Sequence, residues 1–133
     1  FKNFIRQPSI LFNKNKRSLK LHFDMHHGYG NLDKAIEVMH EKDREEFRKF
    51  VNSVYSYNPH IVFIAKPKIA DKWFEDLFTW LFQCEKIFGF ENLKGYDTQR
   101  LYAYLAERYL SFWFKKYTKN LEWPWIFYDE KKP

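Results

Sequence analysis

The sequence is poor in cysteine, glycine and proline. Cys84 is the one cysteine among 133 residues, so neither an internal disulfide nor a cysteine metal cluster can form. A small extracellular scaffold held by disulfides is therefore excluded, and Cys84, on the apolar face of a predicted helix, is expected in the core. Only four glycines and five prolines interrupt the chain, without a low-complexity tract or a repeat. These absences predict one continuous domain.

Long apolar runs are also absent. The most apolar stretch, 73–82, contains Glu75 and Asp76, and no run of about 18 uncharged apolar residues occurs. A membrane-spanning helix is therefore not predicted. Aromatic residues, in contrast, make up 22% of the sequence and hydrophobic residues 45%, which excludes an intrinsically disordered chain.

Acidic residues are missing from the N-terminal part of the chain. Residues 1–23 contain six basic residues and no acidic one, and the basic ones are Lys2, Arg6, Lys14, Lys16, Arg17 and Lys20. The other residues are balanced, so the formal net charge of +6 lies in this segment. We divide the chain into a basic arm over 1–18, a single helix-rich domain over 19–128 and a polar tail over 129–133. Nucleic acid is not indicated as a partner of the domain, whereas residues 1–23 could contact the anionic inner membrane face.

Hydrophobic periodicity predicts a helix-rich α+β fold with two or three short strands. Polar and apolar residues alternate over 18–26, a continuous apolar run covers 60–65, and 123–128 is typical of an edge strand because Pro124 cannot donate to a ladder. Apolar residues at helical spacing predict helices over 32–54 (one long or two joined), 69–88 and 98–117.

The first candidate site consists of His22, Asp24 and His26, with His27 beside them. On a strand these three alternate residues project from one face, and in a helix His22 and His26 remain neighbours. Two imidazoles and a carboxylate are suitable ligands for zinc, manganese or iron. The same pattern is typical of the solvated face of a half-buried strand, and an imidazole could also bind a phosphate or a sugar hydroxyl without metal.

Two further features could bind phosphate or sugar. The segment 28–30 reads Gly-Tyr-Gly before a predicted helix, where it either presents backbone amides to a phosphate or forms a plain tight turn. The last predicted helix begins with a charged group made of Asp97, Arg100, Glu107 and Arg108. This group is either an ion-pair set or a means of holding a sugar or phosphate.

Three groups of residues follow one another in an order that points to a family. The first is His26, His27, Leu32 and Asp33; the second is Val62, Phe63 and Ile64 with Trp80, Leu81 and Phe82; the third is Arg100, Leu105, Glu107, Arg108 and Leu110. Over about residues 20–128 this order resembles the C-terminal half of bacterial capsular-polysaccharide and lipopolysaccharide glycosyltransferases, long catalogued only as a domain of unknown function. Ile61 and Ala103 depart from the family pattern, which has Asn and Gly at these places.

The resemblance implies an α/β fold, the C-terminal part of a Rossmann-like GT-A glycosyltransferase. It implies a cytoplasmic enzyme, peripheral at the inner membrane if the arm binds there, that transfers a sugar from a nucleotide-sugar donor to a growing capsular or lipopolysaccharide glycan. We expect this portion alone to be inactive. The implied roles are catalytic for Asp97 and Glu107, substrate-binding for His26, His27, Arg100 and Arg108, and divalent metal binding (Mn or Mg) for His22, Asp24 and His26.

Two other functions fit the same sequence. One is a non-catalytic binding module whose basic arm docks on anionic membrane lipid or nucleic acid. The other is a structural or partner-interaction domain, favoured by the number of aromatic residues, some of which must lie near the surface.

Overall fold

Helices form all the regular secondary structure between residues 17 and 123, which is the part of the chain that the computed structural model describes. In chain order they are α2 (Leu19–His26), α3 (Asn31–Glu37), α4 (Glu41–Ser53), α5 (Pro67–Phe88), α6 (Tyr96–Gln99) and α7 (Leu101–Tyr117). None of these helices is both long enough and apolar enough to cross a membrane.

The predicted α/β fold with a Rossmann-like topology and short strands is wrong. Within residues 17–123 there is no strand, because 18–26 forms helix α2 and 60–65 belongs to an irregular connection between α4 and α5. The third predicted strand, 123–128, lies outside the described residues except for Trp123.

Helix α2 is buried on more than one side, and this explains why residues 18–26 were predicted to form a strand. Ser18 caps α2, since its Oγ accepts a hydrogen bond from the Leu21 amide at 3.2 Å. Leu19 and Phe23 lie in the main hydrophobic core, whereas Leu21 is buried apart from it. A helix that is covered on two sides buries alternate residues, so it produces the sequence pattern of a half-buried strand.

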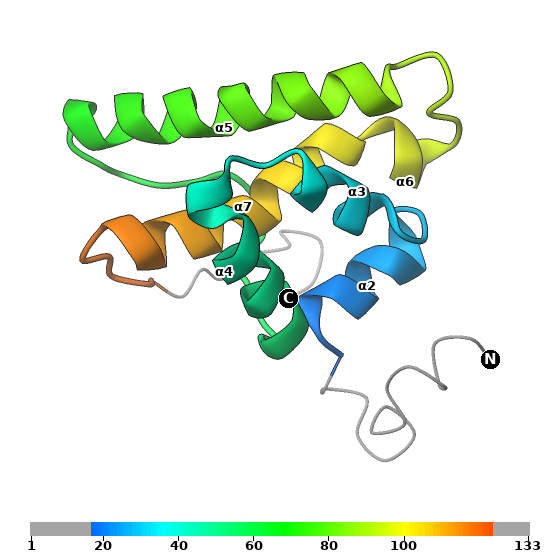
Figure 1. Cartoon of the computed structure of the whole chain (residues 1–133). Coiled ribbons are helices and arrows are strands. Elements are labelled where there is room, and N and C mark those ends of the chain that lie inside the picture. Colours follow the sequence, from blue (N-terminus) through cyan, green and yellow to red (C-terminus); the bar gives the residue numbers. More distant parts are fainter. Residues whose placement is uncertain (1–16, 124–133) are drawn as a thin grey trace, which may run out of the picture.

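The central helix of the fold is α7. Helix α5 packs against one side of α7 and α4 against another, while α2 and α3 pack on α4 (Figure 1). The core residues come mainly from these helices: Leu101, Leu105, Tyr109, Phe112 and Trp113 of α7, Trp73, Leu77, Trp80 and Cys84 of α5, and Phe47 and Val51 of α4. The core is therefore largely aromatic.

The predicted helix over 69–88 is confirmed as α5, whereas the predicted helix over 98–117 is divided at Arg100 into the short α6 and the long α7. Helix α5 has Pro67 at its first position and ends before Gly89, whose φ of 58° lies in the left-handed region. The stretch 32–54 forms two helices, α3 and α4, with a turn between them. The Trp80 Nε1 atom donates to the Ala35 carbonyl at 2.7 Å, which joins α5 to α3.

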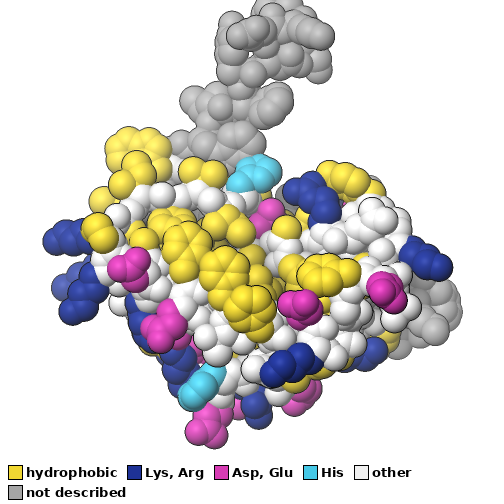
Figure 2. Space-filling model, turned by 90° about the horizontal axis from the view of Figure 1, so that it is seen from above, with side chains coloured by type: hydrophobic (Ala, Val, Ile, Leu, Met, Phe, Trp, Pro, Cys, Tyr) yellow, Lys and Arg dark blue, Asp and Glu magenta, His cyan; other side chains and the backbone are white. Residues whose placement is uncertain are grey.

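The face of α5 that points away from the core carries a row of phenylalanines. Phe74, Phe78 and Phe82 are spaced four residues apart, and neighbouring rings stack with centroids 5.9 and 6.2 Å apart. All three are exposed. Figure 2, which views the molecule from the α5 side, shows hydrophobic side chains gathered on this face. Surface aromatic residues, which the partner-interaction hypothesis expected, therefore occur on α5.

Candidate functional site

A buried arginine joins α7 to the end of α2. The Arg108 Nη2 atom lies 3.1 Å from His22 Nδ1 and 3.4 Å from His27 Nε2, and its Nη1 donates to Glu107 Oε2 at 3.1 Å. The Tyr57 ring lies against the guanidinium, with its centroid 4.3 Å from Arg108 Cζ. These five residues form what we call the histidine–arginine cluster.

The arginine determines which ring nitrogens carry hydrogen. A guanidinium can only donate, so His22 Nδ1 and His27 Nε2 must both accept. The hydrogen of each neutral imidazole is then on the other nitrogen. For His27 this is Nδ1, which lies 3.3 Å from the Asp97 carbonyl oxygen and donates to it. The backbone of Asp97 thus completes the contacts of His27.

Both histidines are neutral at pH 7. Burial, together with the positive charge of Arg108, lowers the pKa of His22 and of His27 from 6.5 to about 4. Burial also lowers the pKa of Arg108, and Tyr57 and Glu107 oppose this effect. An arginine keeps its proton in proteins, so the cluster holds one positive charge beside the Glu107 carboxylate.

Three exposed polar residues lie beside the cluster. Tyr104 stacks on His27 with ring centroids 3.7 Å apart, and the Arg100 guanidinium lies 5.5 Å from the Tyr104 ring on the next turn of α7. Arg100 Nη1 donates to the Tyr96 hydroxyl at 2.6 Å. Arg100 and Asp97 are exposed, and so is His26, whose ring lies 4.7 Å from that of His22. We call His26, Asp97 and Arg100 the rim of the cluster.

The comparisons with known proteins give one result. Residues 2–119 match the family described as domain of unknown function DUF4422. The chain belongs to this family. Comparison with curated proteins and with solved structures gives no match. The match establishes membership of DUF4422 alone, because the description of this family names no activity; the link to glycosyltransferases stays a prediction.

The structure separates Asp24 of this DUF4422 chain from the two histidines predicted to bind metal with it. Asp24 Oδ1 accepts from the Gly30 amide at 3.0 Å, and its Oδ2 pairs with Lys20 at 3.0 Å. His22 and His26 stay together because they are one helical turn apart. Among residues 17–123 no group of three or more His, Cys, Asp or Glu side chains is arranged to hold a metal ion. The metal role stays a prediction.

The Gly-Tyr-Gly segment forms the turn between α2 and α3. Gly28 and Gly30 have φ values of 97° and 77°, and a Cβ added to Gly28 would clash with the Asn31 side chain. The Gly30 amide already donates to Asp24. This arrangement favours the plain-turn interpretation over a phosphate-binding loop.

The proposed basic arm lies mostly outside the described residues, which begin at Arg17. Lys20, assigned to the same charged segment, is part of α2. Its Nζ pairs with Asp24 at 3.0 Å and with Asp33 at 2.6 Å. The charge of Lys20 is therefore used within the fold.

Two residues that contact this site, Tyr104 and Tyr57, were not predicted from the sequence. Tyr104 stands midway between Arg100 and Arg108 at four-residue spacing, so a helical wheel would have placed it on their face. Tyr57 lies in the connection after α4, and no pattern in the sequence signals its contact with α7.

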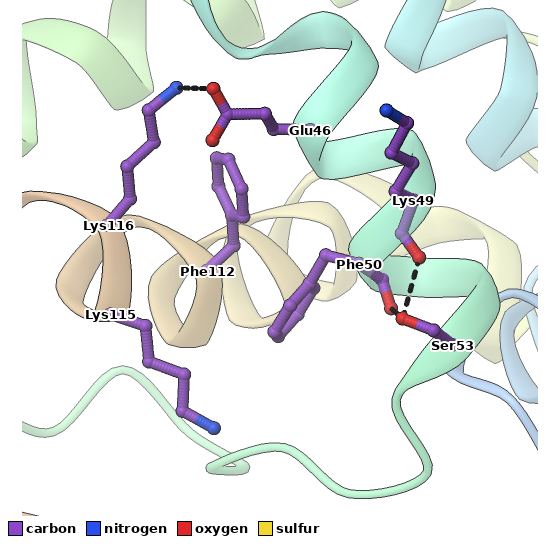
Figure 3. A pocket seen from close by; sticks show the side chains of 7 residues that line it. All are labelled: Glu46, Lys49, Phe50, Ser53, Phe112, Lys115 and Lys116. Atoms are coloured by element: carbon purple, nitrogen blue, oxygen red, sulfur yellow. Dashed lines mark hydrogen bonds and ion pairs between the residues drawn. The ribbon is translucent and has the colours of Figure 1, made fainter.

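A separate hollow of about 540 Å³ lies between α4 and α7 (Figure 3). It is lined by Glu46, Lys49, Phe50, Ser53, Phe112, Lys115 and Lys116. Lys116 Nζ contacts Glu46 at 3.0 Å, Asp43 at 3.0 Å and the Lys42 carbonyl at 2.7 Å. Because these contacts use its three N–H groups, Lys116 has no donor left for a ligand.

Proposed function

We propose that this DUF4422 chain is part of a nucleotide-sugar-dependent glycosyltransferase, and that the rim of the histidine–arginine cluster binds the donor. The observation that supports this most is that three exposed residues each lie beside the cluster. The His26 ring lies next to His22, the Asp97 carbonyl next to His27, and the Arg100 guanidinium over the Tyr104 ring that stacks on His27. Membership of the family and the motifs quoted above add to it. The proposal does not use the Rossmann-like fold, which the described residues lack.

The chemistry of the rim suits a nucleoside diphosphate. Arg100 is exposed and offers the planar donors that bind phosphate oxygens in pairs. Arg108 adds a positive charge in a poorly hydrated environment, where its field is weakly screened. A diphosphate held by Arg100 and His26 would therefore be stabilised further by a charge that it does not touch.

The carboxylates have different environments and hence different proposed roles. In sugar transfer the acceptor oxygen bonds to the anomeric carbon, the bond from that carbon to the phosphate oxygen breaks, and the acceptor proton passes to a base. Asp97 is exposed and could receive this proton. Glu107 is only 13% exposed and pairs with Arg108, so it serves to position the guanidinium. A divalent ion would stabilise the leaving diphosphate, but the described residues offer no group arranged to hold one.

Calorimetric titration with a panel of uridine and guanosine diphosphate-sugars tests the proposal without requiring turnover. We expect one donor class to bind, and Arg100→Ala and His26→Ala each to weaken binding about tenfold, as the loss of one charge-assisted contact predicts. Lys68→Ala is the matched control, because it removes an exposed cation from α5. Absence of binding across the panel, or an equal loss in the control, contradicts the proposal.

A further inference from the structure

A second site lies along the connection between α4 and α5, the segment that also contributes Tyr57. A groove of about 970 Å³ is bounded by the connection between α4 and α5, by the C-terminal half of α7 and by the residues after α7. Ile69, Leu110 and Phe114 are among its lining residues and are at least partly buried. Its volume and apolar lining are those of a pocket for a small organic ligand.

The groove concentrates the most exposed apolar side chains of the described chain. The four large hydrophobic residues with the highest exposure are Ile64 at 104%, Leu121 at 90%, Trp123 at 85% and Val62 at 83%. All four line this groove. Contiguous apolar surface in contact with water is unfavourable and usually marks a site that a ligand or partner covers.

The charges at the groove that are not paired within the described residues are positive. Lys66 and Lys119 line it, are exposed, and form no ion pair with any residue in the described part of the chain. Its one acidic lining residue, Glu122, pairs with Lys115 at 3.3 Å. The groove is therefore apolar along its walls and positive at two points.

Two hydroxyl groups that line the groove are already engaged. The Asn58 backbone amide donates to Ser111 Oγ at 2.9 Å, and Thr118 Oγ1 donates to the Phe114 carbonyl at 2.7 Å. Because the lining is mainly apolar, it suits a hydrocarbon chain.

The backbone at the groove is also unusual. His60, which lines it, has a φ of 65° and is the one residue other than glycine in the left-handed region between residues 17 and 123. This conformation is uncommon for a residue with a Cβ, and His adopts it more readily than most such residues.

We propose that this groove binds a single-chain anionic amphiphile, with its alkyl or isoprenoid chain against Val62, Ile64 and Leu121 and its anionic head at Lys66 and Lys119. The inference does not rest on the proposed sugar transfer, because the groove shares no lining residue with the histidine–arginine cluster.

Decyl phosphate and decanol, used below the concentrations at which they aggregate, test the groove in the full chain. Calorimetry should show saturable binding of decyl phosphate, and the exposed Trp123 should give a blue shift in fluorescence. Ile64→Asp should weaken binding by about tenfold or more. Phe82→Asp, a matched change of an exposed residue on α5, should leave it unchanged. K66A/K119A should weaken decyl phosphate binding several-fold and leave decanol binding unchanged.

Four results would overturn the proposal. The first is no saturable binding, and the second is an equal loss in Ile64→Asp and Phe82→Asp. The third is a dimer on a sizing column that Ile64→Asp dissociates, since a second copy would then cover the groove. The fourth is binding that occurs only in W125D/F127D, since residues after Trp123 would then be its occupant. These results can be distinguished from a failure of the proposed sugar transfer, because the nucleotide-sugar titration uses another ligand and other variants.

Discussion

Acidification from pH 7 to pH 5 should destabilise this protein through its two neutral histidines. The pKa of His22 and that of His27 are lowered to about 4 in the folded state, whereas both rings titrate near 6.5 when unfolded. Below pH 6.5 the unfolded chain therefore binds protons that the folded chain does not. The free energy of unfolding falls as pH falls through this range, and the loss ends near pH 4, where the folded rings also become protonated.

The size of the effect follows from the same values. At pH 5, which is 1.5 units below 6.5, each ring contributes a loss of about 2 kcal/mol. His27 is 5% exposed, but His22 is only half-buried, and both rings contact one guanidinium. Because partial exposure and coupling reduce the total, we expect a combined loss of about 2–3 kcal/mol. For a domain of this size that lowers Tm by roughly 10 °C.

Urea denaturation followed by tryptophan fluorescence at pH 7, 6 and 5 measures this loss. His22→Asn and His27→Gln each place an amide oxygen near the accepting nitrogen and do not titrate, so each should remove about half of the pH dependence. Asp76 does not interfere. Burial acts to raise its pKa, but hydrogen bonds from Lys42 and Trp113 outweigh burial, so the pKa of Asp76 lies below 3.8 in the folded state and this group does not titrate between pH 7 and pH 5.

The matched control is His26→Gln, which removes an exposed ring and leaves both neutral rings in place. It should keep the full pH dependence. Equal stability at pH 7 and pH 5, or an unchanged loss when His22 and His27 are both replaced, would refute the account of the histidine–arginine cluster.

Three further predictions concern the core. Asp43→Ala should lower the free energy of unfolding by about 3–5 kcal/mol in urea denaturation, because the buried carboxylate accepts from Tyr109 at 2.7 Å and pairs with Lys116 at 3.0 Å; a loss below 1 kcal/mol would contradict it. Cys84 is buried, and burial raises its pKa to about 12, so Ellman's reagent should react only after unfolding; rapid reaction of the native protein would show an open thiol. Trp80→Phe should cost about 1–2 kcal/mol, since the Ala35 carbonyl loses its donor, and an unchanged Tm would count against that bond.

Part of the fold could be predicted because long helices carry a redundant signal. In α5 and α7 the apolar spacing repeats over several turns, and Gly89 marks one end. In the short α2 the same eight residues fit a strand or a helix, so the pattern could not discriminate. The run at 60–65 is apolar, as in a buried strand, but it has no partner strand among the described residues and leaves Ile64 exposed.

The candidate site shows the same division. His22, His26, Arg100 and Arg108 could be identified by residue type and by helical spacing along one element. That Arg108 is buried and faces His27 depends on contact between α7 and the end of α2, which are about 80 residues apart in the chain. Tyr57 enters the cluster from a loop, where no periodicity exists to predict a direction.

The sequence alone therefore determined the aromatic character of this chain, its long helices and the residue types of the cluster, because composition and local periodicity are properties of neighbouring residues. Only the tertiary structure decided that α2 is a helix, that Asp24 is turned away from the histidines, and that the imidazoles are neutral. These three features depend on which residues, distant in the sequence, pack against each group. Such burial decides whether a short segment forms a helix or a strand, and it shifts the pKa of an ionisable side chain.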